Sequence, residues 1–292
     1  MLSTLGHVGQ QTPALLAHAG QPVAPNEVWG AWNLDPVLVA GLLALAALYV
    51  RGGRAGGGGR WRRWRTWAFW AAIGALAVAL LSPLEAMSAA LASAHMVQHV
   101  LLILVAAPLL AFSAPSSTLL GGAPVAVRRV PGRLRRRLRL PTSAIRPSTN
   151  PATVWLLHVA VLWIWHSATA YEAALGSELL HGTEHLLFLV TALLFWRVVL
   201  GGRRSGRVPE GAAVLLVFGM AMQSVFLSLL LTFASEPWYA AYTTTTAAWG
   251  LVPLADQQLA GVLMWVPAGM VYMAIGLALF VSWIHHSERA TM

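Results

Sequence analysis

The stretch HMVQHVLLILVAAPLLAFS, residues 95–113, decides the fold class of this chain of 292 residues. Past its first turn it is almost continuously apolar, and as a helix rising 1.5 Å per residue it crosses roughly 30 Å of hydrocarbon. Six more apolar runs approach or reach this length, at 34–50, 66–84, 152–170, 179–200, 211–234 and 257–284. Because backbone groups in hydrocarbon must be hydrogen-bonded internally, such continuous runs favour helices over barrel strands. The sequence predicts an all-α integral membrane protein, a bundle of seven transmembrane helices.

The composition agrees with a membrane protein and excludes several kinds of chemistry. The chain is 58% hydrophobic and 10% charged, with a mean hydropathy of +0.65. All 19 basic residues are arginine, so lysine is missing, and cysteine is missing as well. The chain therefore cannot form a Schiff base, a P-loop, an iron–sulfur cluster or a thiolate metal site. Any metal must be held by imidazole, thioether, carboxylate or backbone oxygen.

The arginines lie only in alternate connections between the apolar runs. Six fall between the first two runs, eight between Arg128 and Arg146, four after the fifth run, and Arg289 follows the last. Under the positive-inside rule this pattern predicts an N-terminus outside and a cytoplasmic C-terminus. The inner side then carries 19 arginines and two acids, Glu210 and Glu288, a net +17, and the outer side carries the other eight acids.

One domain is the economical interpretation. We expect an extracytoplasmic N-terminal tail at 1–33, a seven-helix transmembrane domain at 34–284 and a cytoplasmic tail at 285–292. The predicted arginine-rich cytoplasmic loops are 51–65, 114–150 and 197–210. These loops are expected to bind anionic headgroups of membrane lipids. A nucleic-acid partner is not expected, because the arginines do not form a solvated basic face.

Histidines gather at the predicted outer ends of three runs. The third run begins with His95 and His99 one turn apart, and the fifth begins LLHGTEHLLFL, with His181 and His185 spaced the same way. His166, in WIWH, lies about 22 Å along the outward fourth run, at a similar depth. A single histidine at a helix end is usually a capping or interfacial residue, whereas two pairs at matched depth favour a shared site. Neutral imidazole suits copper, zinc and iron, so these five residues are the predicted metal ligands.

Other polar and sulfur-containing groups are candidates to support such a site. They are Glu184, Met96, Met87, Asp256 and Gln98. Thioethers favour Cu(I), so a histidine and methionine set without cysteine favours a copper ion. His158 lies deeper, and we expect it to hydrogen-bond a neighbouring helix. No residue is assigned a catalytic role.

Several motifs together resemble the seven-span CtaG family of bacterial cytochrome c oxidase assembly factors. They are HMVQHVLL with APLLAFSAP, WIWH, LLHGTEHLLFL with LLFW, and DQQLAG with MWVP, over roughly residues 85–285. The resemblance implies a multi-pass protein of the bacterial plasma membrane that matures haem–copper oxidase, with oxidase subunits or other assembly factors as partners and copper handling as its role. It also implies importance for the motif positions His95, His99, His166, His181, Glu184, His185 and Asp256.

The residues leave other functions open. Paired histidines on facing helices can ligate haem, as in a b-type membrane redox protein, although both pairs here lie at one membrane edge. A copper or proton transporter could use His158, Gln223 and the outer histidines as a path. A scaffold that only binds oxidase subunits and other assembly factors would need no metal. The order H-x-x-E-H at 181–185 is a transposed zinc-hydrolase motif without an obvious third ligand. We expect a non-enzymatic factor that takes copper at a shallow histidine site, open to the periplasmic or extracellular side, and passes it to an oxidase subunit.

Overall fold

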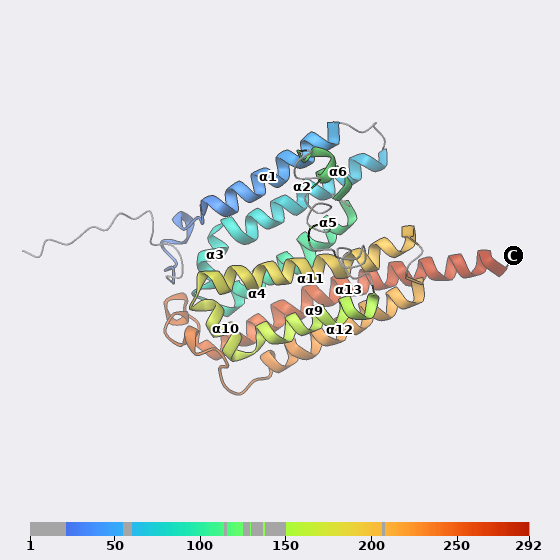
Figure 1. Cartoon of the computed structure of the whole chain (residues 1–292). Coiled ribbons are helices and arrows are strands. Elements are labelled where there is room, and N and C mark those ends of the chain that lie inside the picture. Colours follow the sequence, from blue (N-terminus) through green and yellow to red (C-terminus); the bar gives the residue numbers. More distant parts are fainter. Residues whose placement is uncertain are drawn as a thin grey trace, which may run out of the picture.

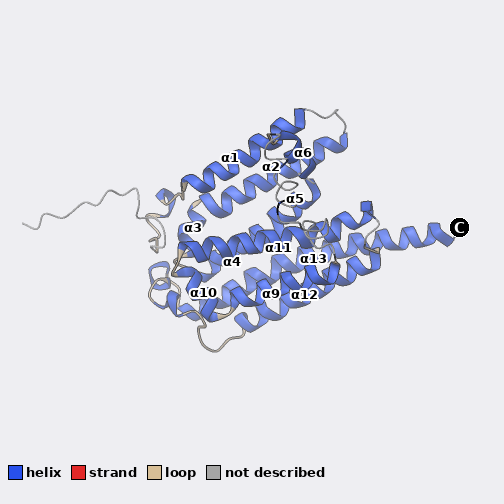
Figure 2. Ribbon diagram, in the orientation of Figure 1, coloured by secondary structure: helices blue, strands red, loops and turns tan. Residues whose placement is uncertain are grey.

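A computed structural model describes residues 22–54, 60–113, 116–124, 129, 137, 150–205 and 208–291. Within these ranges all regular structure is helical (Figure 2). Six helices are long and apolar enough to cross a membrane, and a bent pair raises the number to as many as seven. The predicted all-α fold is confirmed for the described residues, with six or seven candidate membrane-spanning helices.

Five long helices correspond to predicted runs. They are α1 (Pro36–Arg54), α2 (Arg60–Leu81), α11 (Glu178–Ser205), α12 (Glu210–Thr232) and α13 (Pro253–Thr291). The short elements among them are η1 (Val28–Gly30), α3 (Pro83–Ser88), α6 (Ser116–Gly122), α10 (Ala168–Leu175), η3 (Ala240–Thr243) and η4 (Thr246–Trp249).

The third run is a helix with a π-helical segment in its middle. It consists of α4 (Ala92–Val100), the π segment η2 (Leu101–Ala106) and α5 (Ala107–Ser113). Pro108 lacks an N–H and its ring crowds the carbonyl four residues earlier, which disfavours regular α geometry just before it. The Trp196 indole N–H donates to the Ile103 carbonyl at 2.9 Å, which satisfies one buried acceptor in this segment.

The fourth run is broken where a straight helix over 152–170 was expected. Helix α9 (Pro151–His166) ends at His166, and α10 turns away from it by 72°. Ser167 is extended, with ψ 141°, and its hydroxyl donates to the Ile164 carbonyl at 2.6 Å. The Tyr239 hydroxyl donates to the His166 carbonyl at 3.0 Å, so side chains satisfy acceptors that the ended helix leaves free.

Where the structure describes them, the expected loops at 51–65 and 197–210 and the expected tail at 285–292 are mostly helical. Helix α1 continues to Arg54, α2 already begins at Arg60, α11 continues to Ser205 and α13 to Thr291. Arginine is a good helix former, and its long side chain allows a helix to continue beyond the hydrocarbon. Residues 1–21 of the predicted N-terminal tail and most of the 114–150 loop lie outside the described residues.

Figure 1 shows α1 and α2 side by side along one edge of a bundle that contains α4, α9, α11, α12 and α13. Helix α13 packs against α12 and α4, α11 packs against α9 and α5, and α2 packs against α5. A large apolar core joins α4, α9, α11, α12 and α13, and a smaller one joins α1 and α2 to η2 and α5.

Charges separate between the two ends of the bundle. We call the end at which α4, α11 and α13 begin the histidine end, on the left in Figure 1. It holds the acids of α3, α10 and the first turns of α11 and α13, among them Glu85, Glu172 and Asp256. The opposite, arginine end holds the end of α1, the start of α2 and the ends of α11 and α13.

Candidate metal site

The five predicted histidines converge at the histidine end; we call them, with Glu184, the histidine cluster. Ring centroids of neighbours on one helix lie 4.4 Å apart for His95 and His99, and 4.2 Å apart for His181 and His185. Between α4 and α11 the spacing is 5.0 Å from His95 to His181 and 5.6 Å from His99 to His185. His166 joins from the end of α9, with its ring 5.6 Å from that of His99. The structure therefore brings together the five histidines of α4, α9 and α11, as the sequence predicted.

Glu184 lies inside this group of rings. Its carboxylate oxygens are 3.6 Å from His95 Nε2 and 3.5 Å from His99 Nε2, and its side chain is fully buried. Two overlapping sets each offer ligand atoms within 4.8 Å of one another: His95, His99 and His185, and His95, His181 and Glu184. Such spacing allows one cation to contact three ligands at once.

Hydrogen bonds fix which nitrogen of two histidines faces the cluster. His166 Nδ1 lies 2.8 Å from the Leu162 carbonyl, which can only accept, so Nδ1 carries the proton and Nε2 carries a lone pair. The Tyr242 hydroxyl donates to the Ser88 carbonyl at 2.8 Å, so its oxygen accepts from His95 Nδ1 at 3.3 Å. Both residues thus present a basic Nε2, the form that metal ligands adopt.

Most of the polar atoms in the cluster are buried without hydrogen-bond partners among the described residues. They are the Nε2 atoms of His95, His99, His166, His181 and His185, His99 Nδ1, and both carboxylate oxygens of Glu184. Buried polar groups normally find partners, since each unsatisfied one costs about 1–3 kcal/mol. The concentration of such atoms at one point indicates a ligand-binding site.

A loop between α12 and α13, residues 233–252, covers the cluster; we call it the capping loop. Tyr239 and Tyr242 are buried on its inner side, and Thr245 donates its hydroxyl to the Ala90 carbonyl at 2.7 Å. Burial raises the pKa of Tyr242 well above its ordinary value, and it raises the pKa of Tyr239 in the same direction. Both phenols therefore stay protonated and act as donors to the Ser88 and His166 carbonyls.

Replacing Tyr242 with phenylalanine is expected to weaken metal binding about 10-fold, because His95 loses the acceptor that orients its ring. Loss of the bond to Ser88 should also lower the free energy of unfolding by about 1–2 kcal/mol. Metal titration and thermal denaturation in detergent measure the two effects. Tyr171→Phe is the control, since it removes only the 3.1 Å contact to the Tyr242 hydroxyl and leaves the bond to Ser88. Equal losses in both variants would contradict this role for Tyr242.

The expectation of a shallow, open site is wrong, because the cluster is enclosed. His95, His99, His166 and His185 are each at least nine-tenths buried beneath the capping loop. His181 is the most exposed member, at 16%, and its Nδ1 lies 3.4 Å from Glu85 Oε1, whose side chain is 21% exposed. This pair is the described part of the site that reaches the surface, and we call it the mouth.

Glu85 is held in the mouth by Gln98. The Gln98 amide donates to Glu85 Oε2 at 2.5 Å and to the Ala79 carbonyl at 2.7 Å, so it links α4 to α3 and α2. Burial raises the pKa of Glu85 to about 7; the hydrogen bond from Gln98 opposes this and the Glu184 charge adds to it. Near neutral pH the carboxyl therefore exists in both protonated and ionised forms.

Sequence reasoning missed Glu85, Tyr171, Tyr239 and Tyr242. Glu85 occurs in SPLE, residues 82–85, a pattern typical of a helix capping box, and Ser82 indeed caps α3. That pattern favours a structural explanation and hides the contact to His181. The tyrosines of the capping loop occur in WYAAYT, residues 238–243, and no spacing rule connects such a loop to histidines far away in the chain.

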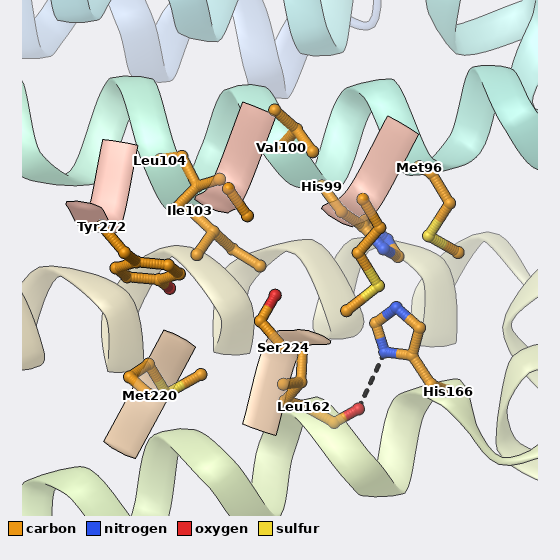
Figure 3. Close-up of a pocket in the computed structure, with 12 residues that line it drawn as sticks. Met96, His99, Val100, Ile103, Leu104, Leu162, His166, Met220, Ser224 and Tyr272 are labelled. Atoms are coloured by element: carbon orange, nitrogen blue, oxygen red, sulfur yellow. Dashed lines mark hydrogen bonds between the residues drawn. The ribbon is translucent and has the colours of Figure 1, made fainter. Parts of the chain in front are cut away.

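The other candidate supporting residues have different roles in the structure. The Asp256 carboxylate accepts from the Ala92 and Ser93 N–H groups at 2.7 and 3.3 Å and from the Ser93 hydroxyl at 2.5 Å, so it caps α4. Met87 packs with Trp249 and Leu251 against a small apolar cluster at the start of α4. Met96 is buried and lines a cavity together with His99 and His166 (Figure 3). Of the five candidate supporting groups, Glu184 and Met96 contact the site, Gln98 acts through Glu85, and Asp256 positions α4.

His158 lies apart from the cluster. Its Nδ1 is 2.9 Å from Thr191 Oγ1 on α11, which confirms the predicted helix–helix hydrogen bond. Gln223 accepts from the Trp163 indole at 3.0 Å. These contacts give both residues structural partners.

A family model described as cytochrome c oxidase caa3 assembly factor (Caa3_CtaG) matches residues 43–286. The chain belongs to this family. The matched range includes the whole histidine cluster, the mouth and the capping loop, and the resemblance drawn from the motifs is confirmed. This family is described as one of assembly factors for cytochrome c oxidase.

The chain is similar to two curated proteins, Uncharacterized protein Mb0105 from Mycobacterium bovis and Uncharacterized protein MT0111 from Mycobacterium tuberculosis. Each is 26% identical over 214 residues, which covers 71% of this chain and 32% of the relative. The chain thus spans about a third of the length of these relatives. No solved structure matches it.

Proposed function

We propose that this protein supplies copper during assembly of haem–copper cytochrome c oxidase, from the histidine cluster at the outer face of the bacterial plasma membrane. Copper is the cargo of this site, taken up through the mouth and released to an oxidase subunit or another assembly factor. Family membership supports the assembly role, and the chemistry of the cluster supports the cargo.

The observation that carries the proposal is the convergence of unpartnered imidazole nitrogens around Glu184. Two imidazoles approach this carboxylate within 3.6 Å, yet none of these contacts is a hydrogen bond. A cation between them would receive lone pairs from nitrogen and negative charge from Glu184, and would satisfy several buried atoms together. Packing alone would leave the same atoms unsatisfied at a free-energy cost.

Copper fits this donor set better than the other candidates. Imidazole suits both copper and zinc, but the methionine thioethers beside the cluster favour Cu(I). Haem is disfavoured because the facing rings lie only 5.0 Å apart for His95 and His181 and 5.6 Å apart for His99 and His185, and the Glu184 carboxylate lies between the two helices, without room for a porphyrin. A zinc hydrolase is disfavoured because Glu184 faces the α4 histidines at 3.5 and 3.6 Å, inside the ligand set, where a general base needs space for water.

The orientation of the chain follows from its charges. The arginine end faces the cytoplasm under the positive-inside rule, so the histidine end faces outward. Acidic residues at that end attract cations, and the arginine-rich end contacts anionic lipid headgroups. The partly exposed pair of Glu85 and His181 gives an arriving ion its first carboxylate and imidazole.

The proposal is tested by two measurements on the full-length protein. Purified in detergent, it is expected to retain at least about one copper ion per chain against a weak chelator. Cells that lack the protein are expected to make oxidase short of copper, and the wild-type gene should restore the metal. Oxidase with a full complement of copper in the deletion strain, or a purified chain that retains none, would reject the proposal.

A further inference from the structure

A small cavity continues the histidine cluster toward the middle of the bundle. Its volume is about 20 Å³, roughly the space that one water molecule needs. It lies between α4, η2, α9, α12 and α13, and three methionines, two histidines and a serine give it sulfur and polar walls: Met96, Met220, Met264, His99, His166 and Ser224. In Figure 3, Met96, His99 and His166 lie at one end, Met220 and Tyr272 at the other, and Ser224 between them.

Two buried histidines contribute unpartnered nitrogens at this cavity. Leu162 accepts from His166 Nδ1, and the other ring nitrogen points toward His99 in Figure 3. His99 and His166 are 3% and 1% exposed, and neither Nε2 has a hydrogen-bond partner within the described part of the chain. Five further lining residues are aliphatic, Val100, Ile103, Leu104, Leu162 and Ala268, so the unpartnered nitrogens, and not the methionines alone, distinguish this cavity from a packing gap. Here thioethers share a wall with basic nitrogens, which is the donor set of a soft metal site.

We infer that this cavity is a second metal position, for Cu(I), which receives its ion from the histidine cluster through His99. The inference rests on the proposed function and extends it. The ligand sets then become softer toward the interior: His95, His181 and Glu184 near the mouth, next His95, His99 and His185, and last His99 and His166 with thioethers. His99 belongs to two neighbouring positions, so an ion can change position without losing all its ligands.

The surroundings select a monovalent ion. The cost of moving an ion from water into an apolar site rises with the square of its charge, so Cu(I) enters more readily than Cu(II) or Zn(II). Neutral imidazole and thioether ligands add no compensating negative charge, and thioethers prefer Cu(I). The ion arrives and leaves as Cu(I), so the transfer needs no electron donor or acceptor.

The experiment loads the purified full-length protein with Cu(I) under anaerobic conditions and measures stoichiometry and X-ray absorption. Wild type is expected to bind about two Cu(I) ions per chain, with both nitrogen and sulfur scattering. The double variant Met96→Leu and Met264→Leu conserves volume and leaves only Met220, at the end of the cavity away from His99 and His166 (Figure 3). It should bind about one ion, with nitrogen or oxygen scattering only. His95→Leu with His181→Leu should do the reverse and keep the sulfur-ligated ion.

Met270→Leu is the matched control, because Met270 lies on α13 like Met264 but is 63% exposed on its outer side. It should leave copper binding unchanged. One ion without sulfur scattering in wild type, or equal stoichiometry in wild type and the Met96/Met264 variant, would overturn the second position and leave the proposed function standing. A wild-type chain that retains no copper would overturn both.

Discussion

A protein carrying His99→Leu and His185→Leu is expected to lose copper affinity by about 100-fold or more while keeping or gaining thermal stability. The two residues share one candidate ligand set with His95, so their loss leaves that set with a single nitrogen and leaves an ion only the outermost set, His95, His181 and Glu184. Stability should not fall, because unpartnered buried nitrogens are replaced by apolar side chains of similar size. A competition titration and a thermal unfolding curve of the same sample measure both quantities.

A loss of copper affinity without a loss of thermal stability distinguishes histidines that bind metal from histidines that hold the fold together. His158→Leu is the matched control, because His158 is equally buried but hydrogen-bonds Thr191 at 2.9 Å. It should lower stability by about 1 kcal/mol, since the bond between α9 and α11 is lost while Thr191 keeps its bond to the Leu187 carbonyl, and leave copper affinity unchanged. Destabilisation of the His99/His185 variant to the same degree as His158→Leu, with copper binding retained, would mean that the cluster is a packing feature.

The grouping of the five histidines could be predicted from the sequence, because the spacing of residues along a regular helix determines which side chains share a face and a depth. Apolar length predicted the spans, arginine distribution matched their ends, and i,i+4 spacing placed His95 with His99 and His181 with His185 on shared faces. Depth along α9 then brought His166 to the same level. Local rules of this kind apply whenever the helix is regular and its starting point is known.

The enclosure of the site could not be predicted because it depends on contacts between distant segments. Tyr242 reaches Ser88 across 154 residues, and Asp256 reaches Ala92 across 164. No proline or glycine near His166 predicts the break that follows it. The break is stabilised by the hydrogen bond from the Tyr239 hydroxyl to the His166 carbonyl, 73 residues apart. Such bonds form only after the helices have assembled. The lengths of the spans therefore could not show that the capping loop buries the histidines.

The Asp256→Ala variant is expected to lower the free energy of unfolding by about 3–5 kcal/mol and to weaken copper binding through α4. Asp256 is fully buried, and its carboxylate accepts two backbone N–H groups and a hydroxyl from the first turn of α4. Alanine would leave these donors buried without partners, at the positive end of the helix. His95 and His99 follow on the next turns, so fraying of this end would move them away from α11.

Asp35→Ala is the control that isolates burial, because Asp35 also caps a helix. Its carboxylate accepts from the Val37 and Leu38 N–H groups at 2.6 and 3.0 Å, in an exposed position at the start of α1. Water can replace those bonds, so the expected loss is about 1 kcal/mol with copper binding unchanged. Asp256→Asn keeps one acceptor oxygen and should fall between the two alanine variants in stability. Unfolding in detergent and copper titration test the series, and equal losses for Asp35→Ala and Asp256→Ala would show that Asp256 does not hold α4 in place for the histidines.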